Sequence, residues 1–209
     1  GLTLDEAAYT ALGVDDAVDF NEDGAQKVSL LNSVLDKKSA NVSDIETWTQ
    51  LEGLAKTVKS VIDTAAGRTA DPELTDVNLQ SLGVADVTDD NLDAVIAALS
   101  AAVASEVDEL NDINTLVTST AGHFDTALTK IRNYAGDDST AVDNSGGVPA
   151  LVDYEAIGID FTALSDDAAL VDSVNTVLAS LPVEGTDVDA AAKVKAIVEA
   201  YDAIRTANN

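Results

Sequence analysis

The sequence predicts an all-α protein built from three tandem three-helix bundle repeats in an elongated array. Apolar residues recur at helical spacing along the whole chain, and no convincing two-residue alternation competes with them. Three short landmarks also recur three times in an unchanged order, which is typical of repeat architectures. The predicted repeats cover residues 1–70, 71–147 and 148–209, called modules 1, 2 and 3 below.

The first landmark predicts the end of a short helix in each module. It reads "ALGV" around Gly13, "SLGV" around Gly83 and "AIGI" around Gly158. Each glycine follows a short apolar segment and precedes Val or Ile. This is the pattern of a helix C-terminus that ends on a left-handed glycine with a hydrophobic residue after it.

The second and third landmarks predict where two longer helices begin. Their first residues can cap a helix N-terminus, and the acidic residues that follow suit the positive end of the helix dipole. The second landmark occupies Asn21–Asp23, Thr88–Asp90 and Ser165–Asp167, and the third occupies Ser43–Glu46, Asn111–Asn114 and Thr186–Asp189. The third helix of module 1 has an apolar stripe at Ile45, Trp48, Leu51, Ala55, Val58 and Ile62.

The connections between modules differ. Gly67–Ala70 is a short link between modules 1 and 2. Residues 136–148, "GDDSTAVDNSGGV", are polar and rich in turn formers, so we expect a flexible acidic joint between modules 2 and 3.

The composition excludes several functional classes. The net charge is −27 and every module is acidic, so nucleic acid and anionic membranes should be repelled. Without Cys the chain can form no disulfide, thiolate metal site or cysteine nucleophile. Because 46% of the residues are hydrophobic, we expect folded protein rather than an acidic linker. Without Met, a signal peptide or a membrane-spanning run, the chain reads as part of a longer protein whose targeting signal lies elsewhere.

"DFNEDG", residues 19–24, resembles the start of an EF-hand calcium loop. Asp19, Asn21 and Asp23 occupy the first, third and fifth ligand positions. However, the twelfth position, which needs a bidentate carboxylate, is Leu30, and the ninth is Lys27. We therefore interpret Asn21 as a helix cap and predict no metal site, while a weaker cation site at these three residues, with weak calcium binding, stays open.

No other residue carries a catalytic signature, so we expect no catalytic or cofactor-binding residue. His123 lacks partners at triad or ligand spacing and is predicted to be a surface histidine. Trp48 lies on the apolar stripe of its helix, which favours core packing over a binding hot spot. Carboxylates are so abundant that no particular pair of them is informative.

Two segments resemble the tandem helical repeats of very large bacterial surface proteins. They are "YEAIGI" (Tyr154–Ile159) and the sequence from Val174 to Asn208; "DNLDAV" (Asp90–Val95) and "IVEAY" (Ile197–Tyr201) match further elements of that pattern. The family includes adhesins of the RTX type and biofilm-associated proteins. The resemblance implies secretion and a place in a long cell-surface chain. It carries no catalytic or ligand residues over to this sequence.

We therefore expect a non-catalytic spacer of a large extracellular bacterial adhesin, contributing to cell-surface attachment or biofilm. Its partners would be neighbouring repeats of the same chain and a host or environmental surface. The first alternative is a helical binding module that captures a protein or surface ligand, marked by an exposed apolar patch. A distant third is a polysaccharide-active enzyme, which would need a pocket.

Overall fold

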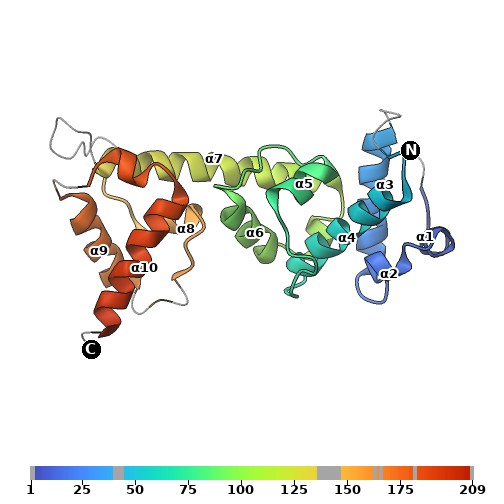
Figure 1. The fold of residues 1–209 in the computed structure, drawn as a ribbon, viewed down its shortest axis with the longest axis horizontal. Coiled ribbons are helices and arrows are strands. Elements are labelled where there is room, and N and C mark those ends of the chain that lie inside the picture. The colour runs from blue at the N-terminus through green and yellow to red at the C-terminus, as the bar shows by residue number, and fades with distance from the viewer. Residues whose placement is uncertain are drawn as a thin grey trace. The chain divides into compact units, whose positions relative to one another are not determined.

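The computed structural model describes residues 3–39, 45–135, 147–161, 164, 167–180 and 183–207. Within these ranges the chain forms helices and no strand (Figure 1), which confirms the predicted all-α class. The α-helices are α1 (Glu6–Leu12), α2 (Asp15–Val18), α3 (Gly24–Ser39), α4 (Trp48–Ala65), α5 (Asp76–Leu82), α6 (Leu92–Ala101), α7 (Leu110–Ala135), α8 (Leu151–Ala156), α9 (Asp167–Leu178) and α10 (Ala191–Ala207). Two 3₁₀ turns, η1 (Ala104–Glu106) and η4 (Gly185–Val188), precede α7 and α10.

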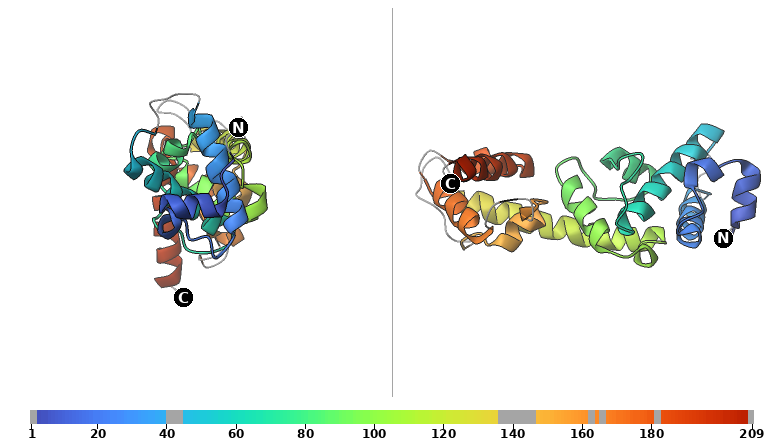
Figure 2. Two further views of the ribbon diagram at one scale, coloured as in Figure 1. Left: turned by 90° about the vertical axis from the view of Figure 1, so that its right-hand side faces the viewer. Right: turned by 90° about the horizontal axis from the view of Figure 1, so that it is seen from below.

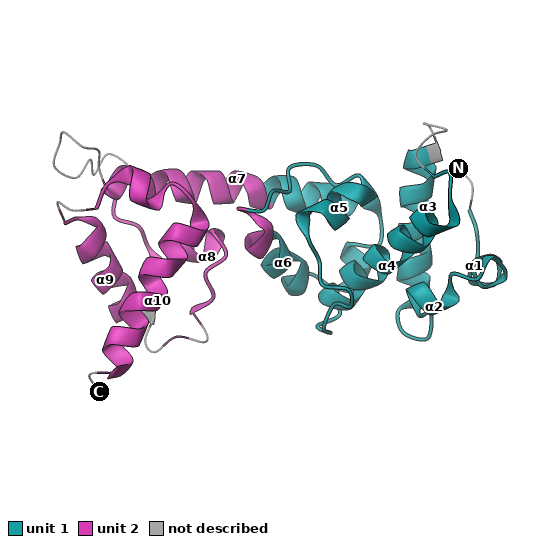
Figure 3. Ribbon diagram, viewed as in Figure 1, with its two compact units in different colours: residues 1–89, 95–119 teal, residues 90–94, 120–209 magenta. Residues whose placement is uncertain are grey.

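The chain divides into two compact units, shown in Figure 3. Unit 1 comprises residues 1–89 and 95–119, and unit 2 comprises residues 90–94 and 120–209. Helices α6 and α7 each contribute residues to both units, because the boundary runs through predicted module 2. The arrangement as three separate three-helix bundles therefore stays a prediction.

The short helices end as the three glycines predict. Gly13, Gly83 and Gly158 have φ angles of 75°, 97° and 84°. At each end the glycine amide donates to the carbonyl three residues back, and the next amide donates to the carbonyl five residues back. This is the Schellman arrangement, which satisfies carbonyls that would otherwise have no partner.

The longer helices begin close to their landmarks: α9 begins at Asp167, the last residue of its landmark, and α6 begins at Leu92, just after its own. Helix α3 begins at Gly24, so the prediction that Asn21 is its N-cap is wrong. Helix α4 begins at Trp48, where Thr47 and Gln50 form a capping box. Helix α7 begins at Leu110, one residue before its landmark, and α10 begins at Ala191, after it. The other landmark residues Ser43 and Ser165, and the joint residues 136–146, lie outside the described residues.

Helix α4 forms the centre of unit 1. It packs mainly against α2, α3 and α5, and ten of its residues between Leu54 and Ala65 are buried. Burial on several sides of this helix explains why apolar residues outside the predicted stripe, such as Leu54 and Val61, are buried too. Trp48, however, is 45% exposed, so its predicted place in the core is wrong. The reason is that the helix starts at Trp48, and its buried part begins only at Leu54.

Unit 2 has one hydrophobic core. It joins the second half of α7 to α8, α9 and α10 through residues that include Phe124, Ile131, Tyr154, Val174 and Val198. Helices α9 and α10 lie side by side in this unit, as Figures 1 and 2 show. Among the described helices, none combines the length and apolar character needed to cross a membrane.

Candidate functional site

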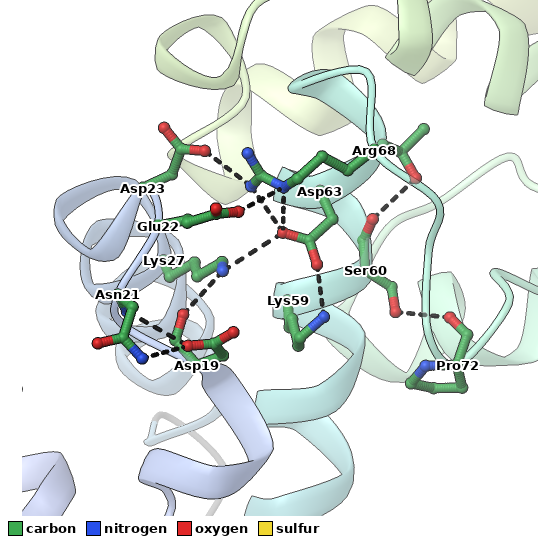
Figure 4. A network of polar contacts seen from close by, with 11 residues as sticks. Asp19, Asn21, Glu22, Asp23, Lys27, Lys59, Ser60, Asp63, Arg68 and Pro72 are labelled. Carbon is green, nitrogen blue, oxygen red and sulfur yellow. Dashed lines mark hydrogen bonds and ion pairs between the residues drawn. The ribbon is translucent and has the colours of Figure 1, made fainter.

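The most concentrated group of charged contacts in the described residues surrounds Asp63 in unit 1 (Figure 4). Asp63 lies in the last third of α4 and is 4% exposed. Its carboxylate contacts the ammonium groups of Lys27 at 3.3 Å and Lys59 at 2.5 Å, and the guanidinium group of Arg68 at 2.7 Å. One buried carboxylate therefore has three cationic partners.

Lys27 reaches this carboxylate from α3. Its side chain is 1% exposed, and its ammonium group also donates to the backbone carbonyl of Asp19 at 2.9 Å. Lys27 is the fourth residue of its helix, and the fourth residues of α6 and α9 are Val95 and Leu170, both fully buried. Module 1 thus has a buried ion where the other modules have an aliphatic side chain. A buried ammonium group needs such partners, because burial without them is very costly.

Arg68 connects the end of α4 to the "DFNEDG" loop. Besides Asp63, its guanidinium group contacts Asp23 at 2.7 Å and Glu22 at 3.4 Å. Arginine can bind several carboxylates at once because its planar group carries five N–H donors. The loop that resembles a calcium site is therefore held by cations of the protein itself.

The three candidate ligands of "DFNEDG" have different partners. The carboxylate of Asp19 accepts a hydrogen bond from the Asn21 amide group at 2.8 Å, whereas Asp23 pairs with Arg68. In the described ranges, no three acidic, histidine or cysteine side chains are grouped so that they could hold a metal ion. Lys27, at the ninth loop position, is bonded to the backbone of Asp19. Weak calcium binding by Asp19, Asn21 and Asp23 stays the open alternative to the prediction of no metal site.

The cations also shift the titration of the acidic groups. Burial alone would raise the pKa of Asp63, but hydrogen bonds from Lys59 and Arg68 and the charge of Lys27 outweigh it, so this pKa lies below its ordinary value. Hydrogen bonds from Asn21 lower the pKa of Asp19. The hydrogen bond with Asp63 raises the pKa of Arg68 further above its ordinary value. The charged forms of Asp63 and Arg68 are therefore both favoured by their contact with each other.

An open hollow of about 410 Å³ lies beside this network. The residues that line it include Asp15, Asp16, Asp19 and Lys59. Small-molecule sites are usually enclosed and mostly apolar. This hollow has a charged lining instead, which is unlike such sites.

His123 is an exposed residue of α7, as the sequence predicts. It lies in unit 2, whereas the network around Asp63 lies in unit 1. Trp48 is also exposed, and a Cβ atom placed on Gly13 would lie 3.8 Å from its ring. The aromatic ring therefore lies at the end of α1, outside the core.

A polar contact that the sequence analysis missed occurs in both units. In unit 1 the Tyr9 hydroxyl donates to Asn32 Oδ1 at 2.8 Å, and Asn32 Nδ2 donates to the Leu4 carbonyl at 2.8 Å. In unit 2 the Tyr154 hydroxyl donates to Asn175 Oδ1 at 2.6 Å, and Asn175 Nδ2 donates to the Pro149 carbonyl at 2.8 Å. Each contact ties a short helix and the segment before it to the following long helix.

The signal for this contact is present in the sequence. Tyr9 and Tyr154 each stand four residues before the helix-ending glycine, and Asn32 and Asn175 are each the ninth residue of their helices. In module 2 these positions hold Leu79 and Ser100, which cannot make the same pair. Burial raises the pKa of both tyrosines, that of Tyr9 to about 12, so both hydroxyl groups act as donors.

The comparisons with known proteins place the chain in no family. No protein-family model matches it, and neither a curated protein nor a solved structure is similar to it.

Proposed function

We propose that this chain is a non-catalytic structural segment, a spacer of repeated helical modules within a large extracellular bacterial surface protein. Such a segment would contribute to cell-surface attachment or biofilm. The observation that carries the proposal is the threefold repetition of one short helix with the same hydrogen-bonded glycine end at Gly13, Gly83 and Gly158. Repetition of a structural unit suits a protein whose task is to add length.

Packing between consecutive modules supports a structural role. Within unit 1, α5 of module 2 packs on α4 of module 1. Within unit 2, the Lys130 ammonium group of α7 pairs with Asp153 of α8 at 2.6 Å, and both helices share one core. In both cases a short helix packs on the long helix that precedes it. Each added module would thereby extend the chain by a fixed step.

The negative charge of the chain supports an extracellular setting of high salt. A net charge of −27 makes neighbouring molecules repel one another. A protein with such an acidic surface remains soluble in salty surroundings. The acidic loop of unit 1 is held by Lys27 and Arg68, so its fold has its own cations. We expect calcium to leave this unit unchanged.

Small-angle scattering at low protein concentration tests this expectation, in millimolar calcium and again in chelator. A spacer with internal cations should have the same maximum dimension in both buffers. Arg68→Gln is the matched variant, because it leaves Glu22 and Asp23 without the guanidinium group and should make the thermal midpoint rise with calcium. Compaction or stiffening of the wild-type chain by calcium would contradict the proposal and point to cation binding by its acidic joints.

A helical binding module is the second candidate. The exposed side chains of Leu12 and Trp48 favour it: Leu12 is the last residue of α1, and the Trp48 ring lies beside the next residue, Gly13. A binding module would use these two side chains to hold a ligand, whereas a spacer has no need of them for that purpose.

A further inference from the structure

The third helices of the three predicted modules obtain their N-terminal hydrogen bonds from different parts of the chain. These helices are α4, α7 and α10. The first four amides of a helix have no carbonyl partner within it, so a helix start needs acceptors from elsewhere. The residues that supply these acceptors show what each helix start depends on.

Helix α4 is capped by residues at its own N-terminus. The Thr47 hydroxyl accepts a hydrogen bond from the Gln50 amide at 3.3 Å. In return, the Gln50 side-chain oxygen accepts hydrogen bonds from the amides of Glu46 and Thr47 at 2.8 and 2.9 Å. Both halves of a capping box are therefore present, and module 1 caps its third helix itself.

Helix α7 begins against α3, a helix of the preceding module. The amide of Leu110, the first residue of α7, donates to the Ser33 hydroxyl at 2.8 Å. One turn earlier on α3, the Ser29 hydroxyl donates to the carboxylate of Glu109, the residue just before α7, at 3.0 Å. Leu110 is buried, and a buried amide without an acceptor is costly. Two hydroxyl groups of module 1 thus hold the start of α7.

Helix α10 begins against residues around the start of α6, which again belong to the preceding module. Asp90 Oδ1 accepts a hydrogen bond at 3.0 Å from the amide of Ala191, the first residue of α10. One turn further along α10, the Lys195 ammonium group pairs with Asp93 at 2.8 Å. The residue before α10 is Ala190, whose side chain has no hydrogen-bonding group. Module 2 thus holds the start of α10.

We propose that modules 2 and 3 each have their third helix capped by the module before it, whereas module 1 caps its own. The proposal rests on the modular spacer proposed above. In such a spacer these caps couple consecutive modules, because a helix start opens when its acceptor in the preceding module is lost. The capping residue lies nearer the N-terminus in both cases, so it is synthesised before the helix that it caps.

Three equivalent amides measure the opening of these helix starts. Leu51, Ile113 and Val194 are the fourth residues of α4, α7 and α10. Each donates to the carbonyl of the residue just before its helix, at 3.3 Å in all three helices. Native-state hydrogen exchange of the full chain, followed by NMR, gives the exchange rate of each amide and hence its local opening.

One substitution removes each of the two caps between modules. Ser33→Ala should accelerate exchange at Ile113 about 5- to 10-fold, the usual effect of losing an N-cap, and leave Val194 unchanged. Asp90→Ala should accelerate exchange at Val194 by a similar factor and leave Ile113 unchanged. Neither substitution should change exchange at Leu51, because α4 caps itself. Circular dichroism melts verify that both variants fold.

Three further variants serve as controls. Ser33→Thr retains a hydroxyl acceptor and Asp90→Asn retains Oδ1, so both should exchange close to the wild-type rates. Thr176 is the tenth residue of α9, as Ser33 is of α3, but its hydroxyl donates to the Asp172 carbonyl of its own helix at 2.8 Å. Thr176→Ala should therefore leave all three amides unchanged.

Wild-type exchange at Ile113 in Ser33→Ala, or at Val194 in Asp90→Ala, would overturn the proposal, because that helix would then begin without the preceding module. Equal acceleration of all three amides by both substitutions would overturn it too, since each helix start would then open only with the whole chain. The calcium comparison measures the dimension of the chain, whereas exchange measures the helix starts. Either result can therefore fail without the other.

Discussion

The least expected residue of the molecule is Lys27, a buried cation inside a helical core. Its ammonium group has two partners, Asp63 and the Asp19 carbonyl, whereas the Asp63 carboxylate has three. This difference makes the pair asymmetric. Loss of Lys27 leaves Asp63 with Lys59 and Arg68, but loss of Asp63 leaves a buried ammonium group with one neutral partner.

This difference between Lys27 and Asp63 predicts that two substitutions change the free energy of unfolding by different amounts. Asp63→Ala should lower the free energy of unfolding of unit 1 by about 3–5 kcal/mol, the usual cost of breaking a buried ion pair from one side. Lys27→Leu, which places the aliphatic side chain of Leu170 at this position, should change it by about 1 kcal/mol or less, in either direction. Urea unfolding of both variants measures this. Equal losses would show that Lys27 contributes as much as Asp63 does.

Asp63 should also make the stability of the chain depend on acidity. Its pKa lies below the ordinary value of 3.8 in the folded chain. A lowered pKa means that the stabilisation is present above about pH 3.8 and is lost as the pH falls through the folded pKa. The unfolding free energies of wild type and Asp63→Asn should therefore differ at neutral pH and converge in acid. A difference that stays constant down to about pH 2.5 would contradict this assignment.

The apolar spacing of the sequence predicts the burial of a residue correctly where neighbours in its own helix decide that burial. It fails where a residue of another helix decides it. Leu31, Val58 and Ile62 follow the apolar period and are buried. Lys27 departs from that period because its partner Asp63 lies in another helix. Trp48 fits the period but lies at the first residue of its helix, where little of the core surrounds it.

At the scale of elements, the local sequence predicts the ends of the short helices to the residue, but the starts of the long helices only to within a few residues. The ends at Gly13, Gly83 and Gly158 depend on hydrogen bonds within six residues, so the local sequence specifies them. The starts had too many candidates, because an acidic chain rich in Asp, Asn, Ser and Thr offers capping side chains nearly everywhere. Asp90 is an example: it lies just before the start of α6, as its landmark predicts, but its carboxylate accepts a hydrogen bond from the amide of Ala191 at the start of α10.

The same glycines allow a matched test of element packing. A Cβ atom on Gly13 would lie 3.8 Å from the Trp48 ring, whereas one on Gly158 would lie 2.8 Å from the Ala94 backbone nitrogen and 2.9 Å from Asp93 Cβ. Gly13→Ala should therefore cost only the left-handed backbone, about 1–2 kcal/mol. Gly158→Ala should cost this amount plus about 1–3 kcal/mol for overpacking. Thermal melts compare the two. Equal costs would mean that Asp93 and Ala94 are free to move away.

At the scale of the whole molecule, the repeats predicted from the sequence and the compact units of the structure have different boundaries. The three modules follow from local landmarks, but α7 is longer than α4 and α10 and contributes to both compact units. Which helices pack together depends on side chains far apart in the chain, such as Ser33 with Leu110 in unit 1 and Asp90 with Ala191 in unit 2. No local pattern contains that information.

The cooperative unit of folding can be located with three equivalent core positions. Leu31, Leu99 and Val174 are the eighth residues of α3, α6 and α9, and all are 0% exposed. Leu31 and Leu99 belong to different predicted modules but to one compact unit, and Val174 belongs to the other unit. An aspartate at any of these positions would bury an unpaired charge and should unfold the region that depends on it.

Native-state hydrogen exchange shows which region that is. If the compact units are cooperative, Leu31→Asp and Leu99→Asp should both remove protection from α3, α4 and α5 and leave α9 and α10 protected. Val174→Asp should do the reverse, and Val152→Asp, at a 65% exposed position of α8, should change little. Protection of α5 in the Leu31→Asp variant would instead favour independent modules. Loss of protection throughout the chain would show that all the helices unfold as one cooperative unit. Unfolding would then extend across the boundary between the compact units as well as across the boundaries between the predicted modules.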